Sequence, residues 1–79
     1  MNKFYFTFGQ VHRTKTGIPL KDFYVTVIAS SHNKAIEIFE KEFTSKYMDS
    51  IDRYATSYTE NNFKSHFFPN GEFKLLKEN

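Results

Sequence analysis

The chain has no cysteine, which excludes disulfide bonds and the cysteine-containing zinc sites. It has only three glycines, none closely spaced, so it lacks the phosphate-binding loops of Rossmann and P-loop proteins. No G-x-S-x-G nucleophile motif is present. The N-terminus does not have the pattern of a signal peptide, and no apolar run approaches the roughly 20 residues that span a bilayer. These absences predict a non-catalytic protein without a cofactor, located in the cytoplasm and not in a membrane.

Aromatic side chains are abundant by contrast. Ten Phe and five Tyr occur among 79 residues, a length that predicts a single domain, residues 1–79. A domain this short buries only roughly 60% of the surface that its unfolded chain exposes. Each aromatic ring buries about 150–250 Å², so a few of them supply a core. The net charge of +2 permits contact with an anion or a nucleic acid without requiring it.

Two segments in the first half alternate with the period of a β-strand. Residues 3–8 place Phe4, Phe6 and Phe8 on one face, which predicts a strand with one buried face. Residues 22–29 carry bulky side chains on both faces, which predicts a central strand. Because both strands present apolar residues, we expect them to share one sheet.

A helix is predicted over residues 31–44. Ser30 and Ser31 offer an N-cap, since a serine oxygen accepts from the free N–H groups of a first helical turn. The segment then shows apolar residues at helical spacing, namely Ala35, Ile36, Phe39 and Phe43, with Ile38 at the edge. This stripe is expected to pack on the phenylalanine face of the sheet.

The second half predicts shorter elements. Residues 53–58 alternate as a third strand, and residues 60–67 fit a short helix with Phe63 and Phe67 four apart. The 69–71 sequence Pro-Asn-Gly predicts a turn, followed by a last strand over 73–76 with Phe73 and Leu75 inward. The order β-β-α-β-(α)-β predicts an α+β fold: a small, mostly antiparallel sheet with one main helix packed on one face.

The sheet face away from the helix is a candidate binding surface. It would carry Tyr5, Thr7, Tyr24, Thr26 and Ile28, and a two-layer domain leaves such a face uncovered. Lys3, Lys21 and Arg53 flank the two tyrosines, so their rings would stack a base as other nucleic-acid-binding sheets do. Alternatively, both tyrosines are ordinary strand residues covered by a partner or by a second copy of the chain.

The loop over residues 9–21 is the second candidate surface. Together with Gly9 and Gln10 it presents basic side chains suited to grip an anion, namely His12, Arg13, Lys15 and Lys21. The alternative is a solvated basic loop. The three histidines do not have metal-ligand spacing, so no metal site is expected, and His32 and His66 are expected to be exposed. The carboxylates of Asp49 and Asp52 fit a solvated turn better than acid–base catalysis.

Part of the sequence resembles a loose group of very small bacteriophage and mobile-element proteins, most of them without an assigned function. The resemblance rests on the run FTFGQVH over 6–12, the strand YVTVIA over 24–29, and a following helix with Ala35 and Phe39. It covers about the first half of the chain, with a weaker match over 54–58 and 68–71. It implies that Gly9, Gln10 and His12, with Thr7 and Tyr24 beside them, are binding positions.

The resemblance also implies a function. Many such proteins inhibit by binding, so we expect a small phage-type protein that blocks a host defence or regulatory component, in the manner of anti-CRISPR proteins. The alternatives are a sponge that sequesters an anionic nucleotide signal and an accessory protein that binds nucleic acid. The partner would be a host defence protein, a ribonucleoprotein or a nucleotide, and a homodimer formed through a sheet edge or the open face is compatible with each. The expected binding residues are Tyr5, Thr7, Gly9, Gln10, His12, Arg13, Lys15, Tyr24, Thr26 and Arg53.

Overall fold

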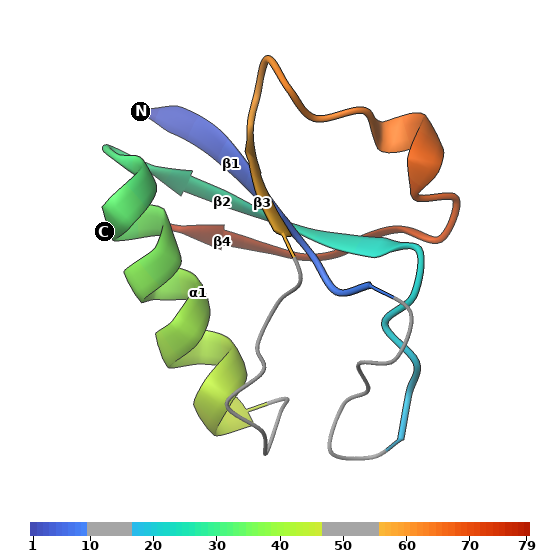
Figure 1. Cartoon of the computed structure of the whole chain (residues 1–79). Helices are drawn as coiled ribbons and strands as arrows, with labels where there is room; N and C mark the ends of the chain where they lie inside the picture. Colours follow the sequence, from blue (N-terminus) through green and yellow to red (C-terminus); the bar gives the residue numbers. More distant parts are fainter. Residues whose placement is uncertain (10–16, 47–55) are drawn as a thin grey trace.

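A computed structural model describes residues 1–9, 17–46 and 56–79. The described elements are β1 (Asn2–Thr7), β2 (Phe23–Ala29), α1 (His32–Lys46), β3 (Thr56–Thr59), the short 3₁₀ helix η1 (Ser65–Phe67) and β4 (Gly71–Lys77) (Figure 1). One main helix and a four-stranded sheet confirm the predicted α+β fold.

The strands are ordered β3-β1-β2-β4 in one sheet. β1 runs antiparallel to both β2 and β3, whereas β4 runs parallel to β2. The sheet is therefore mostly antiparallel, as predicted, with one parallel pair at its edge. β2 lies between β1 and β4, which confirms the central position predicted from the bulk on both of its faces.

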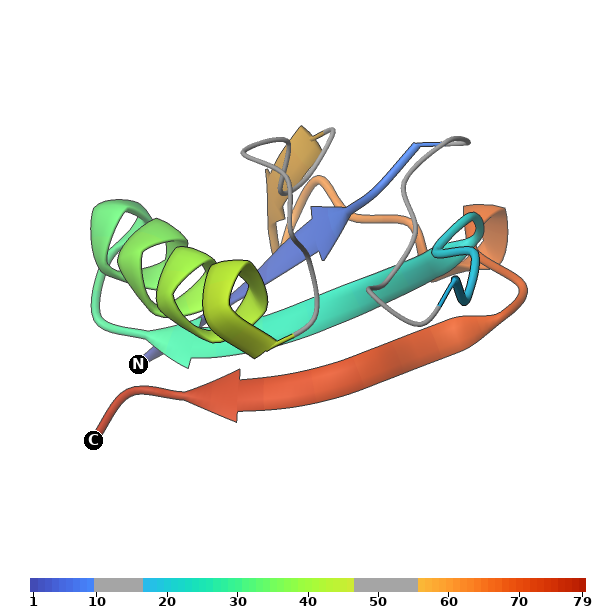
Figure 2. The same ribbon diagram turned by 90° about the horizontal axis from the view of Figure 1, so that it is seen from below.

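Helix α1 packs on one face of the sheet, which we call the helix face (Figure 2). Phe6 stacks on Phe39 with ring centroids 4.5 Å apart, and Phe39 stacks on Phe43 at 4.6 Å. Phe8, just beyond β1, is also fully buried against both helix rings. The phenylalanines on the buried face of β1 and those on the apolar stripe of α1 thus form one core.

The start of α1 is capped as the sequence predicts. The Lys34 backbone N–H donates to Ser31 Oγ at 3.1 Å, and the Ala35 N–H donates to the Ser31 carbonyl at 3.0 Å. Ser31 is thus the N-cap residue. The predicted stripe is confirmed, because Ala35, Phe39 and Phe43 are fully buried.

The last strand differs from the prediction in which leucine faces inward. Tyr24 pairs with Glu72 and Val25 pairs with Lys74, so Phe73 is an extra residue at a bulge. A bulge shifts the alternation of every later side chain by one position. Leu76 is therefore buried and Leu75 is 53% exposed, so the prediction that Leu75 points inward was wrong. Phe73, as predicted, packs against the core.

The face opposite α1, which we call the tyrosine face, is partly covered by the chain itself. The segment from Glu60 to Asn70 crosses it and places Phe63 on Tyr5, with ring centroids 4.1 Å apart. The expectation of an uncovered face was therefore wrong around Tyr5 and Tyr24, whereas Leu75 on the same face is exposed. The predicted helix over 60–67 is also shorter than expected. β3 ends at Thr59, whose carbonyl accepts hydrogen bonds from the backbone N–H groups of Asn62 and Phe63 in a turn. Of the predicted helix, only Ser65–Phe67 is helical.

Candidate functional site

Five of the predicted binding residues lie within the described structure: Tyr5, Thr7, Gly9, Tyr24 and Thr26. The other five lie outside the described residues, namely Gln10, His12, Arg13, Lys15 and Arg53. The predicted turn with Asp49 and Asp52 lies outside them as well. The proposed role of the basic loop therefore stays a prediction. The structure gives positions only for the predicted binding residues on the tyrosine face and for Gly9.

Strand register brings four of these residues together. Tyr5 pairs with Thr26, and Thr7 pairs with Tyr24 on one side and with Thr56 on the other. Both threonines are buried, and each hydroxyl donates within the sheet: Thr7 Oγ1 to the Thr56 carbonyl at 3.3 Å, and Thr26 Oγ1 to Glu72 Oε1 at 2.6 Å. These bonds give both threonines a structural role. Gly9 lies just past β1 and has a positive φ of 68°, which glycine adopts without strain.

The two tyrosines are part of an aromatic cluster that extends over the tyrosine face. Tyr24 meets Phe63 edge-on at 4.8 Å and Phe68 at 6.3 Å. Phe63 also stacks on Phe68 at 5.3 Å. Phe63 therefore occupies one face of the Tyr5 ring, and a base would have to displace Phe63 to stack there.

Two carboxylates, those of Glu60 and Glu72, lie near the Tyr5 hydroxyl. Burial raises the pKa of the Tyr5 hydroxyl, and the nearby Glu60, Tyr24 and Glu72 groups raise it further. The phenol therefore stays neutral well above physiological pH. Of the three cations expected to flank the tyrosines, Lys3 lies on β1 opposite Ile28, whereas Arg53 lies outside the described residues.

A recess that sequence reasoning missed lies on the segment that covers the tyrosine face. Its volume is about 320 Å³, and it is lined by Tyr58, Asn62, Lys64, Phe67 and Phe68. The Phe67 side chain is 63% exposed, with the His66 ring against it at 4.3 Å. His66 is exposed, as expected. The one available signal was the Phe63/Phe67 pair, which helical spacing would place on the same side of a short helix.

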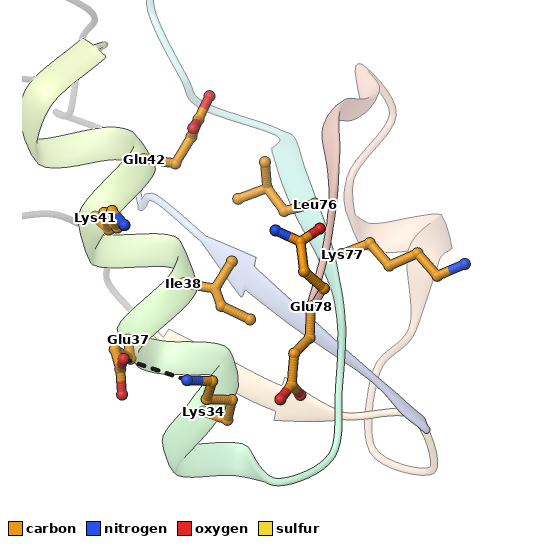
Figure 3. Close-up of a pocket in the computed structure, with 9 residues that line it drawn as sticks. Lys34, Glu37, Ile38, Lys41, Glu42, Leu76, Lys77 and Glu78 are labelled. Carbon is orange, nitrogen blue, oxygen red and sulfur yellow. Dashed lines mark hydrogen bonds and ion pairs between the residues drawn. The ribbon is translucent and has the colours of Figure 1, made fainter.

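A larger groove of about 580 Å³ separates α1 from the end of β4 (Figure 3). Ile38 and Leu76 contribute its apolar surface. The lining carboxylates have partners: Glu37 lies 3.4 Å from Lys34, and Glu42 lies 3.8 Å from Lys74. Glu78 accepts from the Ser30 backbone N–H at 2.8 Å and from its hydroxyl at 2.9 Å, which lowers the pKa of Glu78.

His32 is not the exposed side chain expected from the sequence. It is half-buried, and its ring stacks on Phe4 with centroids 5.0 Å apart. Its Nε2 lies 2.9 Å from Ser57 Oγ in a hydrogen bond. Helical geometry explains the difference, because the first residue after the N-cap lies over the sheet next to β1. His32 therefore joins α1 to β1 and β3.

Within residues 1–9, 17–46 and 56–79, no cluster of His, Asp or Glu side chains is arranged to hold a metal ion. None of the helices described in the chain has the length and apolar character needed to cross a membrane. The chain matches no protein-family model, no curated protein and no solved structure. Any functional statement therefore depends on the surfaces described above and on the sequence resemblance.

Proposed function

We propose that the chain is a small phage-type binding protein that inhibits a host defence or regulatory component by direct, non-catalytic contact in the host cytoplasm. The observation that carries this proposal is the exposed aromatic recess on the segment 58–68. A ring that is 63% exposed has no role in this core, and aromatic side chains beside a pocket are the usual anchors of protein interfaces. The resemblance to small phage proteins directs the proposal toward host defence.

The recess has the chemistry of an interface core. Phe67 and Phe68 provide apolar surface, and Asn62 and Lys64 provide donors at its margin. Its volume of about 320 Å³ accepts one large side chain of a partner. Phe67 lies in a 3₁₀ helix that contributes no buried residue, so its ring would move to fit a partner without disturbing the core.

An infection assay tests this function. A bacterial strain whose CRISPR system restricts a phage would express the chain, and restored plaque formation is the expected result. Phe67→Ser should abolish most of the rescue because it removes the anchor. Glu37→Ser changes a side chain on α1 that is 70% exposed and away from the recess, and it should leave rescue intact. If the wild-type chain restores no plaques in a panel of defence-proficient strains, the proposal is wrong.

A nucleotide sponge is the second candidate, and Lys64 is the observation that favours it. A base would stack on Phe67 while the Lys64 ammonium meets its phosphate. Tyr5 is less suited, because Phe63 stacks on its ring and the carboxylates of Glu60 and Glu72 lie nearby. Native mass spectrometry of the chain purified from bacteria would detect a bound nucleotide by its mass. Lys64→Ala should lose that mass if the sponge assignment is correct, and absence of any added mass in the wild type would exclude it.

A further inference from the structure

Strand β4 forms one edge of the sheet, and Figure 2 shows no described segment alongside its outer side. An exposed strand edge is a template for pairing with another chain, and proteins usually protect such edges. Leu75 in the middle of β4 is 53% exposed, one of the largest exposed apolar side chains among the described residues. This edge therefore offers both backbone groups and apolar surface.

The backbone groups of Leu75 point away from the sheet. The Glu78 N–H donates to the Ile28 carbonyl of β2 at 2.8 Å, so the backbone of Glu78 faces β2. Successive residues of a strand direct their N–H and C=O groups to opposite sides. Lys77 and Leu75 therefore direct theirs outward, where a further strand would receive them.

Three side chains of β4 share the tyrosine face. Glu72, Leu75 and Lys77 pair with Tyr24, Thr26 and Ile28, which lie on that face. The bulge at Phe73 explains why an even-numbered and two odd-numbered residues share it. Along β4, the side chains on this face are therefore acidic at Glu72, apolar at Leu75 and basic at Lys77.

We propose that β4 pairs antiparallel with β4 of a second copy, about a two-fold axis at Leu75. The two Leu75 residues would form a hydrogen-bonded pair, exchanging both backbone bonds and placing their side chains against each other. Lys77 lies two positions from Leu75 in one direction. Glu72 lies two positions away in the other, because Phe73 and Lys74 together occupy one position at the bulge. Lys77 therefore lies opposite Glu72 of the partner subunit. The axis generates this Lys–Glu pair twice and joins the two sheets into one of eight strands.

Charge complementarity selects a second copy as the partner. The acid-apolar-base order is self-complementary when two strands run antiparallel, whereas a parallel arrangement would place like charges together. The Glu72 carboxylate is held by the Thr26 hydroxyl at 2.6 Å, which orders it before pairing. The remaining edge lysine, Lys74, does not oppose association, because it forms an ion pair with Glu42 on the helix face at 3.8 Å.

Sedimentation equilibrium over a range of concentrations tests this dimer. The wild type should dimerise, and Lys77→Glu should raise the dimer Kd about tenfold because two attractive pairs become repulsive at once. Glu72→Lys should do the same. The double variant with Glu72→Lys and Lys77→Glu re-forms both pairs with the charges exchanged and should recover near-wild-type association. Lys64→Glu, the same charge change away from β4, is the matched control and should not alter the Kd.

Three results would overturn the proposal. One is a wild type that stays monomeric at every concentration. Another is a dimer that neither single charge reversal weakens, which would place the interface elsewhere. The third is a double variant no better than the single ones. Circular dichroism of each variant verifies folding, and Leu75→Pro gives an independent test, since proline at an outward-facing N–H is tolerated on a free edge but removes both central bonds.

Discussion

Phe63 stacks face to face on Tyr5, with ring centroids 4.1 Å apart and ring planes 6° from parallel. One aromatic ring from the connection between β3 and β4 thereby covers part of the face of the sheet that α1 leaves open. Phe63 also contacts Tyr24 at 4.8 Å and Phe68 at 5.3 Å, so it is the centre of a second aromatic layer. A small domain gains in this way an apolar layer on each side of its sheet.

Replacing Phe63 should test how much this second layer stabilises the fold. Phe63→Ala should lower the free energy of unfolding by about 1–3 kcal/mol, less than a fully buried ring would because Phe63 is half-buried. Urea unfolding followed by circular dichroism measures the loss. Phe67→Ala is the control and should change stability by no more than about 0.5 kcal/mol, because that ring is mostly exposed. Equal losses in the two variants would contradict the covering role of Phe63.

The helix side of the fold was predictable because local patterns determine it. Alternation placed Phe6 on a buried strand face, and helical spacing placed Phe39 opposite it. The N-cap at Ser31 follows from the hydrogen-bonding ability of one serine. In each case the pattern that decides which side chain is buried or which residue caps the helix lies within one element, so the sequence alone carries the information.

The tyrosine face was not predictable because it depends on contacts between distant segments. Phe63 and Phe67 have the spacing of a helix, yet the turn at Thr59 sends one ring onto Tyr5 and leaves the other exposed. The bulge at Phe73 arises from the pairing of β4 with β2, and it decides that Leu75 is exposed. The candidate surfaces at Phe67 and Leu75 were missed for this reason.

His32 and Ser57 should be energetically coupled. His32 Nε2 lies 2.9 Å from Ser57 Oγ, and the bond joins α1 to β3 across 25 residues of sequence. His32→Ala should cost about 1–2 kcal/mol, since it removes the stack on Phe4 as well as the bond. Ser57→Ala should cost less. A double-mutant cycle should give a coupling of about 0.5–1.5 kcal/mol. Additive losses would show that the bond contributes nothing to stability.

Glu78 should make stability depend on acid pH. Two hydrogen bonds from Ser30 lower its pKa in the folded state, so its contribution is fully present above the pKa of the unfolded chain. That contribution is lost as pH falls through the lower, folded-state pKa. The carboxyl resonance of Glu78, followed by NMR, should titrate below the usual range for glutamate. Glu78→Gln should reduce the loss of stability on acidification, and an unchanged pH profile would contradict this account.

Asp22 should tolerate only residues that adopt a positive φ. Its φ is 63°, and it sits in a turn closed by the Phe23 N–H donating to the Leu20 carbonyl at 3.2 Å. Aspartate, asparagine and glycine enter this left-handed region readily, whereas a β-branched side chain clashes with the backbone there. Asp22→Val should therefore lower the free energy of unfolding by about 1–2 kcal/mol. Asp22→Asn is the matched control and should be nearly neutral in thermal unfolding. A valine variant as stable as the asparagine one would show that the turn relaxes to a negative φ, and that Leu20, fully buried beside it, holds its place in the core without this conformation.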